Sequence, residues 1–238
     1  MGKLGVVVVA AGRGSRMGTQ ESKQYLLLQD KPIVVHTLEL FEQLADVAAI
    51  TLVVGKDDVD RNEDFVRQYG LTKVIRVIAG GAERQHSVYR GLVALEEEGI
   101  EWVLVHDGVR PFVKPEQAVR CYEKARSTDA AAVLAVPVKD TIKLVHSSGV
   151  IASTPDRRSL WAIQTPQAFR LSALLEAHRK AERDGFLGTD DAMLVERLGL
   201  PVHVVEGDYR NLKITTPEDL DMAEYMLSRQ SWRGDTTR

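Results

Sequence analysis

Two kinds of hydrophobic pattern alternate along the chain. Continuous apolar runs predict strands that are buried on both faces, whereas apolar residues spaced three and four positions apart predict helices with one buried face. The predicted strands cover residues 6–9, 50–54, 74–79, 102–105 and 131–136. The predicted helices cover residues 34–45, 58–69, 83–98 and 115–126. Because crossovers between parallel strands are right-handed, this alternation predicts a doubly wound, mostly parallel, Rossmann-like α/β sheet with helices on both faces.

The alternation breaks at Lys139, where a different pattern begins. Residues 139–163 contain two short strand-like stretches, 141–145 and 150–153, which are joined by a Ser-Ser-Gly turn. This pattern predicts a protruding β-arm of two strands. A two-stranded ribbon is only marginally stable in water by itself, so the arm must pack either on its own domain or on a partner chain.

Helical spacing returns in the last part of the chain. It covers residues 171–183, 190–198 and 217–227. The last helix opens with Thr216-Pro217-Glu218-Asp219, which supplies an N-cap, a proline at the first helical position and an acidic residue at the third. Residues 1–228 therefore form one predicted domain that includes the arm, and the polar residues 229–238 form a predicted tail.

Composition and charge narrow the class of protein. The 238 residues are 44% hydrophobic and 27% charged, which is ordinary for a globular protein and unlike a disordered one. The net charge of −3 gives no overall attraction to nucleic acid or to an anionic membrane, so any anion must be bound by a local cluster of Lys and Arg. The N-terminal apolar run is too short to span a bilayer, and the single cysteine, Cys121, predicts a buried thiol in a cytoplasmic protein.

The first predicted strand runs into a loop rich in glycine and arginine, Ala10-Ala11-Gly12-Arg13-Gly14-Ser15-Arg16-Met17-Gly18. Ligands of doubly wound sheets bind at the carboxyl ends of the strands, where small residues let phosphate approach backbone N–H groups. The G-x-G-x-x-x-G spacing differs from the dinucleotide fingerprint, and the sequence has no P-loop motif. Arg13, Arg16 and Lys23 together suit a polyphosphate, and the alternative is a solvated basic loop.

A second glycine turn follows the strand at residues 74–79. It contains Gly80 and Gly81, and the helix after it begins with Arg84 and Ser87 one turn apart on the same face. These two side chains contact a base or ribose, or they form an ordinary polar start to a helix. Both interpretations stay open from the residues alone.

A third polar cluster follows the strand at residues 102–105. Asp107 lies at the tip of this strand, a suitable place to hold a Mg²⁺ ion that bridges phosphates, and an Asx turn is the plainer alternative. His106 is interpreted as a polar residue at the edge of the core, because the sequence has no zinc-site spacing and no serine-hydrolase motif. Further along, Thr189 is expected to cap a helix and Lys213 to lie on a short strand.

These residues belong to a longer series of motifs. In chain order they are A-A-G-x-G-x-R-M-G, K-Q-Y, G-G-x-x-R-x-x-S, H-D-G-V-R-P, D-T-I-K, L-W-x-x-Q-T-P-Q-x-F, T-D-D and N-x-K-I-T. The series resembles the cytidylyltransferases of the non-mevalonate isoprenoid pathway, which join CTP to 2-C-methyl-D-erythritol 4-phosphate. The resemblance extends to about Leu227, and no motif is missing.

The resemblance implies roles for residues at matching positions. The catalytic residues, which stabilise charge around the α-phosphate of CTP, would be Arg16, Lys23 and Lys213. The nucleotide-binding residues would be Ala10, Ala11, Gly12, Arg13, Gly14, Gly80, Gly81, Arg84, Ser87 and Asp107. The residues that bind the polyol phosphate would be Asp107, Thr141, Arg157, Thr165 and Thr189.

The resemblance also implies a cofactor and a partner. Mg²⁺ would be the cofactor, with Asp107 as its ligand, and the chain would form a homodimer that exchanges arms. Thr141 and Arg157 would then enter the neighbouring subunit's site. Within the same class of enzyme, the alternative substrate is ribitol 5-phosphate. A CTP-binding module without catalytic activity is the alternative from another class.

Overall fold

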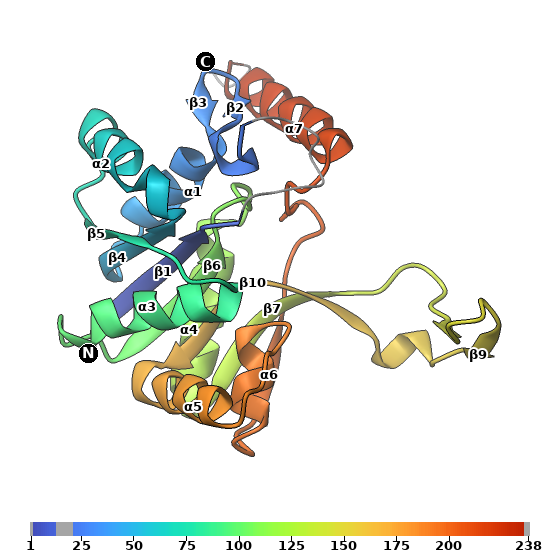
Figure 1. The fold of residues 1–238 in the computed structure, drawn as a ribbon. Helices are drawn as coiled ribbons and strands as arrows, with labels where there is room; N and C mark the ends of the chain where they lie inside the picture. The colour runs from blue at the N-terminus through green and yellow to red at the C-terminus, as the bar shows by residue number, and fades with distance from the viewer. Residues whose placement is uncertain (1, 13–20, 236–238) are drawn as a thin grey trace.

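A seven-stranded sheet runs through the computed structural model, which describes residues 2–12 and 21–235 (Figure 1). The strand order is β11-β7-β10-β6-β1-β4-β5, and β10 runs antiparallel to both of its neighbours while the other pairs are parallel. The predicted mostly parallel α/β fold is therefore confirmed. The strands are β1 (Leu4–Ala10), β4 (Val47–Val54), β5 (Val74–Ala79), β6 (Trp102–Asp107), β7 (Ala131–Pro137), β10 (Trp161–Arg170) and β11 (Val202–Glu206).

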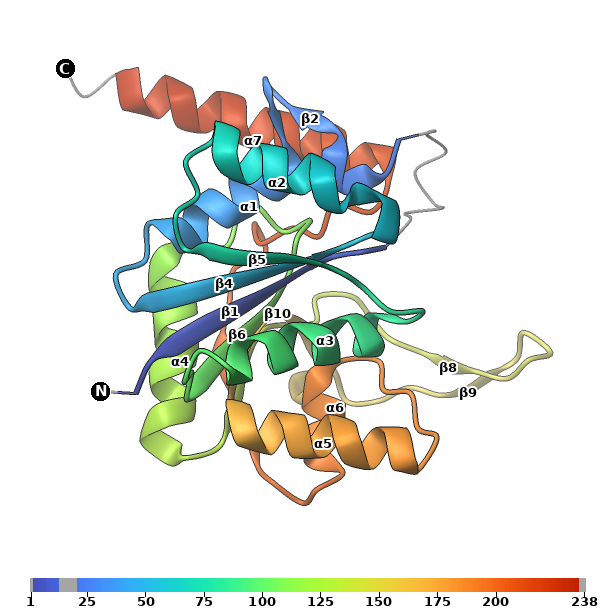
Figure 2. The same ribbon diagram turned by 60° about the vertical axis from the view of Figure 1, so that its left-hand side comes forward.

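Helices cover both faces of the sheet, and Figure 2 shows α1 and α2 on one side and α3 and α5 on the other. Because side chains alternate along a strand, Val6 and Val8 of β1 pack toward α1, α2 and α4, whereas Val7 packs toward α3, α5 and α6. The helices are α1 (Ile33–Glu42), α2 (Val59–Gln68), α3 (Arg84–Glu96), α4 (Pro115–Thr128), α5 (Leu171–Arg183), α6 (Asp191–Glu196) and α7 (Pro217–Asp235). The shorter elements are η2 (Lys23–Tyr25), β2 (Leu27–Leu28), β3 (Lys31–Pro32), η3 (Lys56–Asp58) and η4 (Arg157–Ser159).

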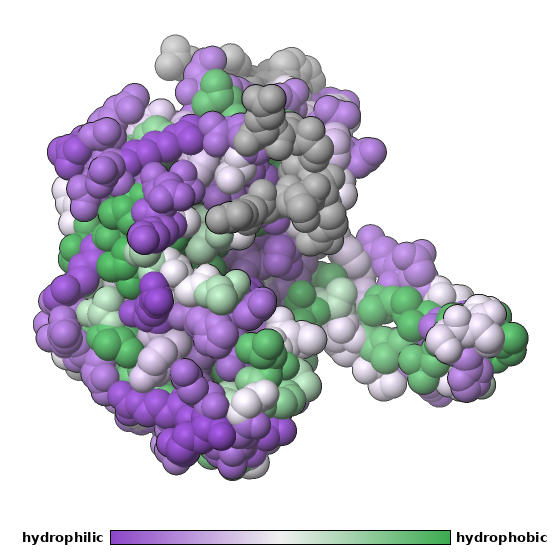
Figure 3. Space-filling view, in the orientation of Figure 1, coloured by the Kyte–Doolittle hydropathy of each residue, from purple (hydrophilic) through white to green (hydrophobic). Residues whose placement is uncertain are grey.

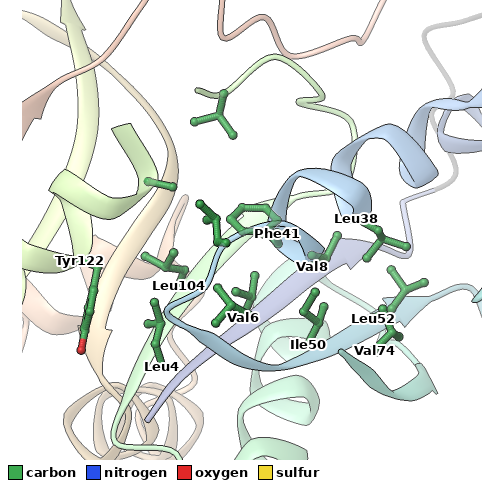
Figure 4. Packing of buried hydrophobic residues seen from close by; sticks show 14 of the residues in the cluster. Leu4, Val6, Val8, Leu38, Phe41, Ile50, Leu52, Val74, Leu104 and Tyr122 are labelled. Atoms are coloured by element: carbon green, nitrogen blue, oxygen red, sulfur yellow. The ribbon is translucent and has the colours of Figure 1, made fainter. Parts of the chain in front are cut away.

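The larger core lies between the sheet and α1, α2 and α4. Leu38 and Phe41 of α1 pack with Val6 and Val8 of β1 in this cluster (Figure 4). Cys121 of α4 is fully buried in the same cluster, and its thiol donates to the carbonyl of Ala132 at 3.4 Å. Burial raises the pKa of Cys121 to about 12, so the thiol stays protonated at neutral pH. The prediction of a buried thiol is confirmed.

A third apolar cluster lies beneath α7 and includes Ala223 of that helix. The predicted cap is present, since Asp219 N donates to Thr216 Oγ1 at 3.3 Å and Thr216 N donates to Asp219 Oδ2 at 2.9 Å. The helix continues to Asp235, so the end predicted near Leu227 is too early. Once the first turn of a helix has formed, each further residue adds a hydrogen bond, so extending the helix costs little free energy. Within the part of the chain that the structure describes, no helix is long and apolar enough to cross a membrane.

The segment between β7 and β10 leaves the body of the molecule as a long arm (Figures 1 and 2). Trp161 pairs with Pro137 at its root, and near its tip β8 (Leu144–Val145) pairs antiparallel with β9 (Ile151–Ser153). The predicted two-stranded arm is present, with shorter strands than expected. Every residue from 141 to 154 is exposed, and hydrophobic side chains show as green patches on the arm (Figure 3).

Candidate active site

Two pockets adjoin one another at the carboxyl ends of β1 and β6. The lining of the first pocket includes Ala10, Ala11, Gly12, Lys23, Gly81, Glu83 and Ser87. The lining of the second pocket includes Arg110, Gln164, Thr165, Gln167, Thr189 and Asp190. Arg84, Asp107 and Lys213 line both pockets, and we call these three residues the shared wall. This position at the strand ends is where the fold predicts a ligand.

The two small-residue turns of the first pocket pack directly against each other. A Cβ on Gly80 would lie 2.6 Å from the Cβ of Ala11 and 2.7 Å from Ser87 Oγ, so the approach requires glycine. Ser87 Oγ accepts a hydrogen bond from Gly81 N at 3.1 Å and donates one to the carbonyl of Glu83 at 3.1 Å. Seven of the predicted nucleotide-binding residues thus meet at the first pocket: Ala10, Ala11, Gly12, Gly81, Arg84, Ser87 and Asp107.

A short 3₁₀ turn, η2, carries Lys23 to the first pocket. Its last residue, Tyr25, is 3% exposed, and its ring lies 6.3 Å from that of Phe65 on α2. Asn62, also on α2, donates to the Tyr25 hydroxyl at 2.8 Å and to the carbonyl of Asp58 at 2.7 Å. Burial raises the pKa of Tyr25 to about 12, so its hydroxyl stays neutral. Tyr25 therefore anchors the turn that positions Lys23.

Asp107 is the centre of the shared wall and is surrounded by cations. Lys213 Nζ lies 2.9 Å from Asp107 Oδ2, Arg84 Nε lies 3.2 Å from Oδ1, and Arg110 Nε lies 3.5 Å from Oδ2. Burial of Asp107 favours the neutral acid, but the three cations outweigh burial and hold its pKa far below the usual range. The carboxylate is therefore ionised, and cations from one helix and two loops converge on it.

Arg84 does not act as a simple polar start to its helix. Its guanidinium spans two acidic side chains, with Nε 3.2 Å from Asp107 Oδ1 and Nη1 2.7 Å from Asp191 Oδ2. Ser87 binds the glycine turn, and both side chains line the first pocket. Asp191 was not predicted as a site residue, although it lies in the T-D-D motif that the sequence analysis singled out.

His106 and Thr165 hold the backbone of Asp107 and Arg110 through hydrogen bonds. Thr165 Oγ1 accepts from Asp107 N at 3.1 Å and lies 3.1 Å from His106 Nδ1, while His106 Nε2 lies 3.0 Å from the carbonyl of Arg110. These partners fit a histidine that accepts at Nδ1 and donates from Nε2. Burial lowers the pKa of His106 to about 4, so the ring is neutral at pH 7. His106 is the structural residue that the sequence predicted.

Asn211 joins the loop of Lys213 to the second pocket. Its side-chain amide donates to the main-chain carbonyl of Thr165 at 2.8 Å and to Gln164 Oε1 at 3.2 Å. Its main-chain carbonyl accepts from Arg110 Nη1 at 2.8 Å. The prediction of a short strand around Lys213 is wrong, because this residue lies in the loop between β11 and α7. Side-chain hydrogen bonds from Asn211 fix the loop where a strand ladder was expected.

Thr189 lines the second pocket, as predicted, but it does not cap the helix after it. The cap of α6 is Asp190, whose carboxylate accepts from Met193 N at 3.0 Å and from Gln167 Nε2 at 2.8 Å. A carboxylate can accept both bonds at once, which leaves the exposed Thr189 hydroxyl at the pocket.

Some predicted site residues line neither pocket, and others lie outside the described residues. Thr141 and Arg157 lie on the exposed arm and line neither pocket of their own chain. Arg13, Gly14 and Arg16 lie outside the described residues. The structure therefore brings together Lys23, Lys213 and the residues of both pockets, whereas the two arm residues would need a partner chain to reach such a site.

The described residues contain no group of three His, Cys, Asp or Glu side chains that could hold a metal ion by themselves. Asp107 is the carboxylate that both pockets share, and its oxygens already face Lys213 and Arg84. Mg²⁺ is often bound by one or two carboxylates together with substrate phosphates and water. Asp107 fits such an ion only when phosphate supplies most of its ligands.

Comparison with known proteins identifies the family. The family model of 2-C-methyl-D-erythritol 4-phosphate cytidylyltransferase matches residues 4–229. A curated relative with that name from Bacillus velezensis is 50% identical over 227 residues, which cover 95% of this chain and 96% of the relative.

Solved structures give the same result. The 4-diphosphocytidyl-2C-methyl-D-erythritol synthase from Anaerococcus prevotii has a TM-score of 0.83 at 31% identity and covers 95% of this chain and 96% of its own. The 2-C-methyl-D-erythritol 4-phosphate cytidylyltransferase from Thermus thermophilus has a TM-score of 0.76 at 33% identity, with coverage of 94% and 98%. The chain belongs to the 2-C-methyl-D-erythritol 4-phosphate cytidylyltransferase family.

Proposed function

We propose that this chain transfers the cytidylyl group of CTP to 2-C-methyl-D-erythritol 4-phosphate, with CTP in the first pocket and the polyol phosphate in the second. The observation that carries the assignment of pockets is the shared wall, where Arg84 and Lys213 face both cavities. Two anionic substrates repel each other, so they can react only where positive charge reaches both. The cytoplasm, which supplies CTP, is the compartment that we propose for this reaction.

The reaction exchanges one phosphorus–oxygen bond for another. A phosphate oxygen of the polyol phosphate forms a bond to the α-phosphorus of CTP, and the bond from that phosphorus to the bridging β-oxygen breaks, so that pyrophosphate leaves. The attacking oxygen is already anionic and needs no strong general base, and His106 is neutral and fully buried. The task of the protein is therefore electrostatic, and the proposed cations for it are Lys23, Lys213 and Arg84, which line the first pocket.

Substrate binding would redistribute the charges of the shared wall. In the structure Lys213 and Arg84 pair with Asp107, and phosphate oxygens are competing partners for both cations. Asp107 would then be free to hold Mg²⁺ together with phosphate oxygens and water. When bound, Mg²⁺ neutralises part of the triphosphate charge. Arg16, which lies outside the described residues, is proposed as a further cation at the α-phosphate.

We also propose a homodimer in which each arm completes the site of the other subunit. Leu144, Val150 and Ile151 are each more than half exposed on the arm, an unfavourable state for apolar side chains unless another surface covers them. Thr141 and Arg157, which the resemblance assigns to the polyol phosphate, lie on the same arm. Exchange of arms would bury the apolar residues and bring Thr141 and Arg157 to the second pocket of the partner.

Pyrophosphate release tests the proposed reaction. Purified protein is incubated with CTP, Mg²⁺ and one acceptor at a time, either 2-C-methyl-D-erythritol 4-phosphate or ribitol 5-phosphate. We expect rapid release with the methylerythritol phosphate and little with the ribitol phosphate. Release with ribitol 5-phosphate alone would contradict the proposed acceptor. CTP binding by calorimetry without release from either acceptor would show a binding module instead of an enzyme.

A further inference from the structure

Asp191 lies directly behind the shared wall, and its side chain is only 1% exposed. It lines neither pocket, so a bound substrate cannot reach it. The backbone on its C-terminal side is fixed by two side chains: Ala192 N donates to Gln167 Oε1 at 3.2 Å, and Met193 N donates to Asp190 Oδ1 at 3.0 Å. Asp191 is therefore a buried acid on a rigid piece of backbone.

The carboxylate of Asp191 has one strong partner. Its Oδ2 lies 2.7 Å from Arg84 Nη1, whereas its Oδ1 faces His178 Nε2 at 3.4 Å without a hydrogen bond. The His178 ring is itself buried and stacks on Tyr89 at 6.0 Å. Burial of Asp191 favours the neutral acid, but Arg84, with a further contribution from His178, outweighs burial and keeps the pKa of Asp191 below its usual range. The charge of Asp191 is thus directed at Arg84.

Arg84 in turn has two anchors of different kinds. Asp107 faces the pockets, so substrate phosphates can compete with Asp107 for Arg84, and a bound cation can compete with Arg84 for Asp107. Asp191 is sealed from the pockets, so its bond to Arg84 can persist while substrates bind and leave. The backbone of Arg84 is held at the start of α3, where Glu83 and His86 form a capping box. With Asp191 in place, the guanidinium has one position at the boundary between the pockets.

We infer that Asp191 is a positioning residue, which holds Arg84 at the boundary between the pockets so that one guanidinium serves the anions of both substrates. The inference rests on the proposed function, since the anions are the triphosphate of CTP and the phosphate of the acceptor. Removal of the Asp191 charge would let the Arg84 side chain adopt several rotamers, and its bond to the transition state would be lost in most of them.

A double-mutant cycle tests this inference, with Asp191→Asn, Arg84→Ala and the double variant. If Asp191 acts through Arg84, Asp191→Asn lowers kcat about tenfold or more in the wild-type background and less than about threefold in the Arg84→Ala background. The matched control is Asp184→Asn, which removes the same charge from an ion pair with Arg197 at the other end of α6. This control is expected to keep kcat within about twofold.

Two further measurements separate positioning from folding and from the proposed reaction. Thermal unfolding shows whether each variant is folded at the assay temperature. Where Asp191→Asn is unfolded, Asp191→Glu, which moves the carboxylate by one methylene, replaces it in the same cycle with the same criteria. Calorimetric titration with CTP repeats the cycle without turnover, and there too the loss of affinity caused by Asp191→Asn should vanish in the Arg84→Ala background.

Either of two results would overturn the inference: Asp191→Asn with a kcat near that of the wild type, or an equal loss in both backgrounds. A wild-type protein that binds CTP but releases no pyrophosphate would refute the proposed function instead. In that case the calorimetric cycle alone decides the role of Asp191.

Discussion

At the scale of single residues, the shared wall makes Lys213 the most informative position. We predict that Lys213→Ala folds normally, because Arg84 and Arg110 still neutralise Asp107. Its kcat should fall by ~10²–10³, the usual loss when one preorganised donor is removed from a developing charge. Lys114→Ala is the matched control, since Lys114 pairs with Asp208 at the same distance of 2.9 Å and lines neither pocket.

Steady-state kinetics and thermal unfolding of the two lysine variants decide this prediction. Near-wild-type turnover of Lys213→Ala would remove this lysine from the catalytic residues, and an equal loss in both variants would indicate a general effect of charge. Both substitutions break one lysine–aspartate pair, and of these two lysines only Lys213 lines the pockets.

The residues of the site were predictable where a sequence signal existed. Glycine turns and cations beside predicted strand ends indicated Gly81, Lys23 and Asp107, and all three line the first pocket. Asp191 and Asn211 were missed because their task is to bind other side chains, and partners 107 and 46 residues away leave no local pattern. The sign of their importance in the sequence was that Asp191 lies in the T-D-D motif and Asn211 in the N-x-K-I-T motif.

At the scale of elements, η2 depends on one buried hydroxyl. We predict that Tyr25→Phe costs about 1 kcal/mol of stability, because it removes the acceptor of the Asn62 amide, which keeps only its bond to Asp58. The looser turn should also lower kcat/KM for CTP by about threefold to tenfold, since a small misplacement of Lys23 weakens its bond to phosphate.

Tyr122→Phe is the control for η2, because Tyr122 is equally buried but lies on α4 with its ring against Trp102, far from both pockets. Denaturant unfolding measures the stability of both variants. CTP kinetics should show an activity loss for Tyr25→Phe alone. If both variants retain wild-type kcat/KM, the hydroxyl of Tyr25 has no part in positioning Lys23.

Of the seven strands in the main sheet, the continuous apolar runs predicted five, and β10 and β11, which break the apolar pattern, were missed. β10 contains the polar residues Gln164, Thr165 and Gln167, which interrupt the apolar pattern of a buried strand. All three are buried, because their side chains form hydrogen bonds with other residues around the pockets. β11 is a short edge strand that is only partly buried, so its pattern is weak. β10 was missed because its polar side chains bind other residues around the pockets, and β11 was missed because it lies at the edge of the sheet.

At the scale of the whole molecule, the arm is the part of the fold that the single chain leaves unexplained. Its root is well anchored, since the Tyr209 hydroxyl donates to the carbonyl of Pro137 at 2.6 Å and Lys139 Nζ lies 3.4 Å from the Tyr209 ring. Beyond that root its apolar side chains face solvent. An arm exchanged between subunits requires an ordered root and a tip that its own chain leaves uncovered. Exchange also predicts that two inactive variants can complement each other in a dimer, which a monomer cannot do.

Mixing two inactive variants tests the exchange. In a dimer of Lys213→Ala with Arg157→Ala, one site combines an intact body with an intact arm, while the other site carries both defects. Random reassociation of equal amounts gives half mixed dimers with one working site each, so we expect recovery of ~25% of wild-type activity. Lys213→Ala mixed with Lys23→Ala is the control and should recover nothing, because both defects lie in the bodies. Light scattering follows the assembly. No recovery from subunits that demonstrably exchange, or a fully active monomer, would refute arm exchange.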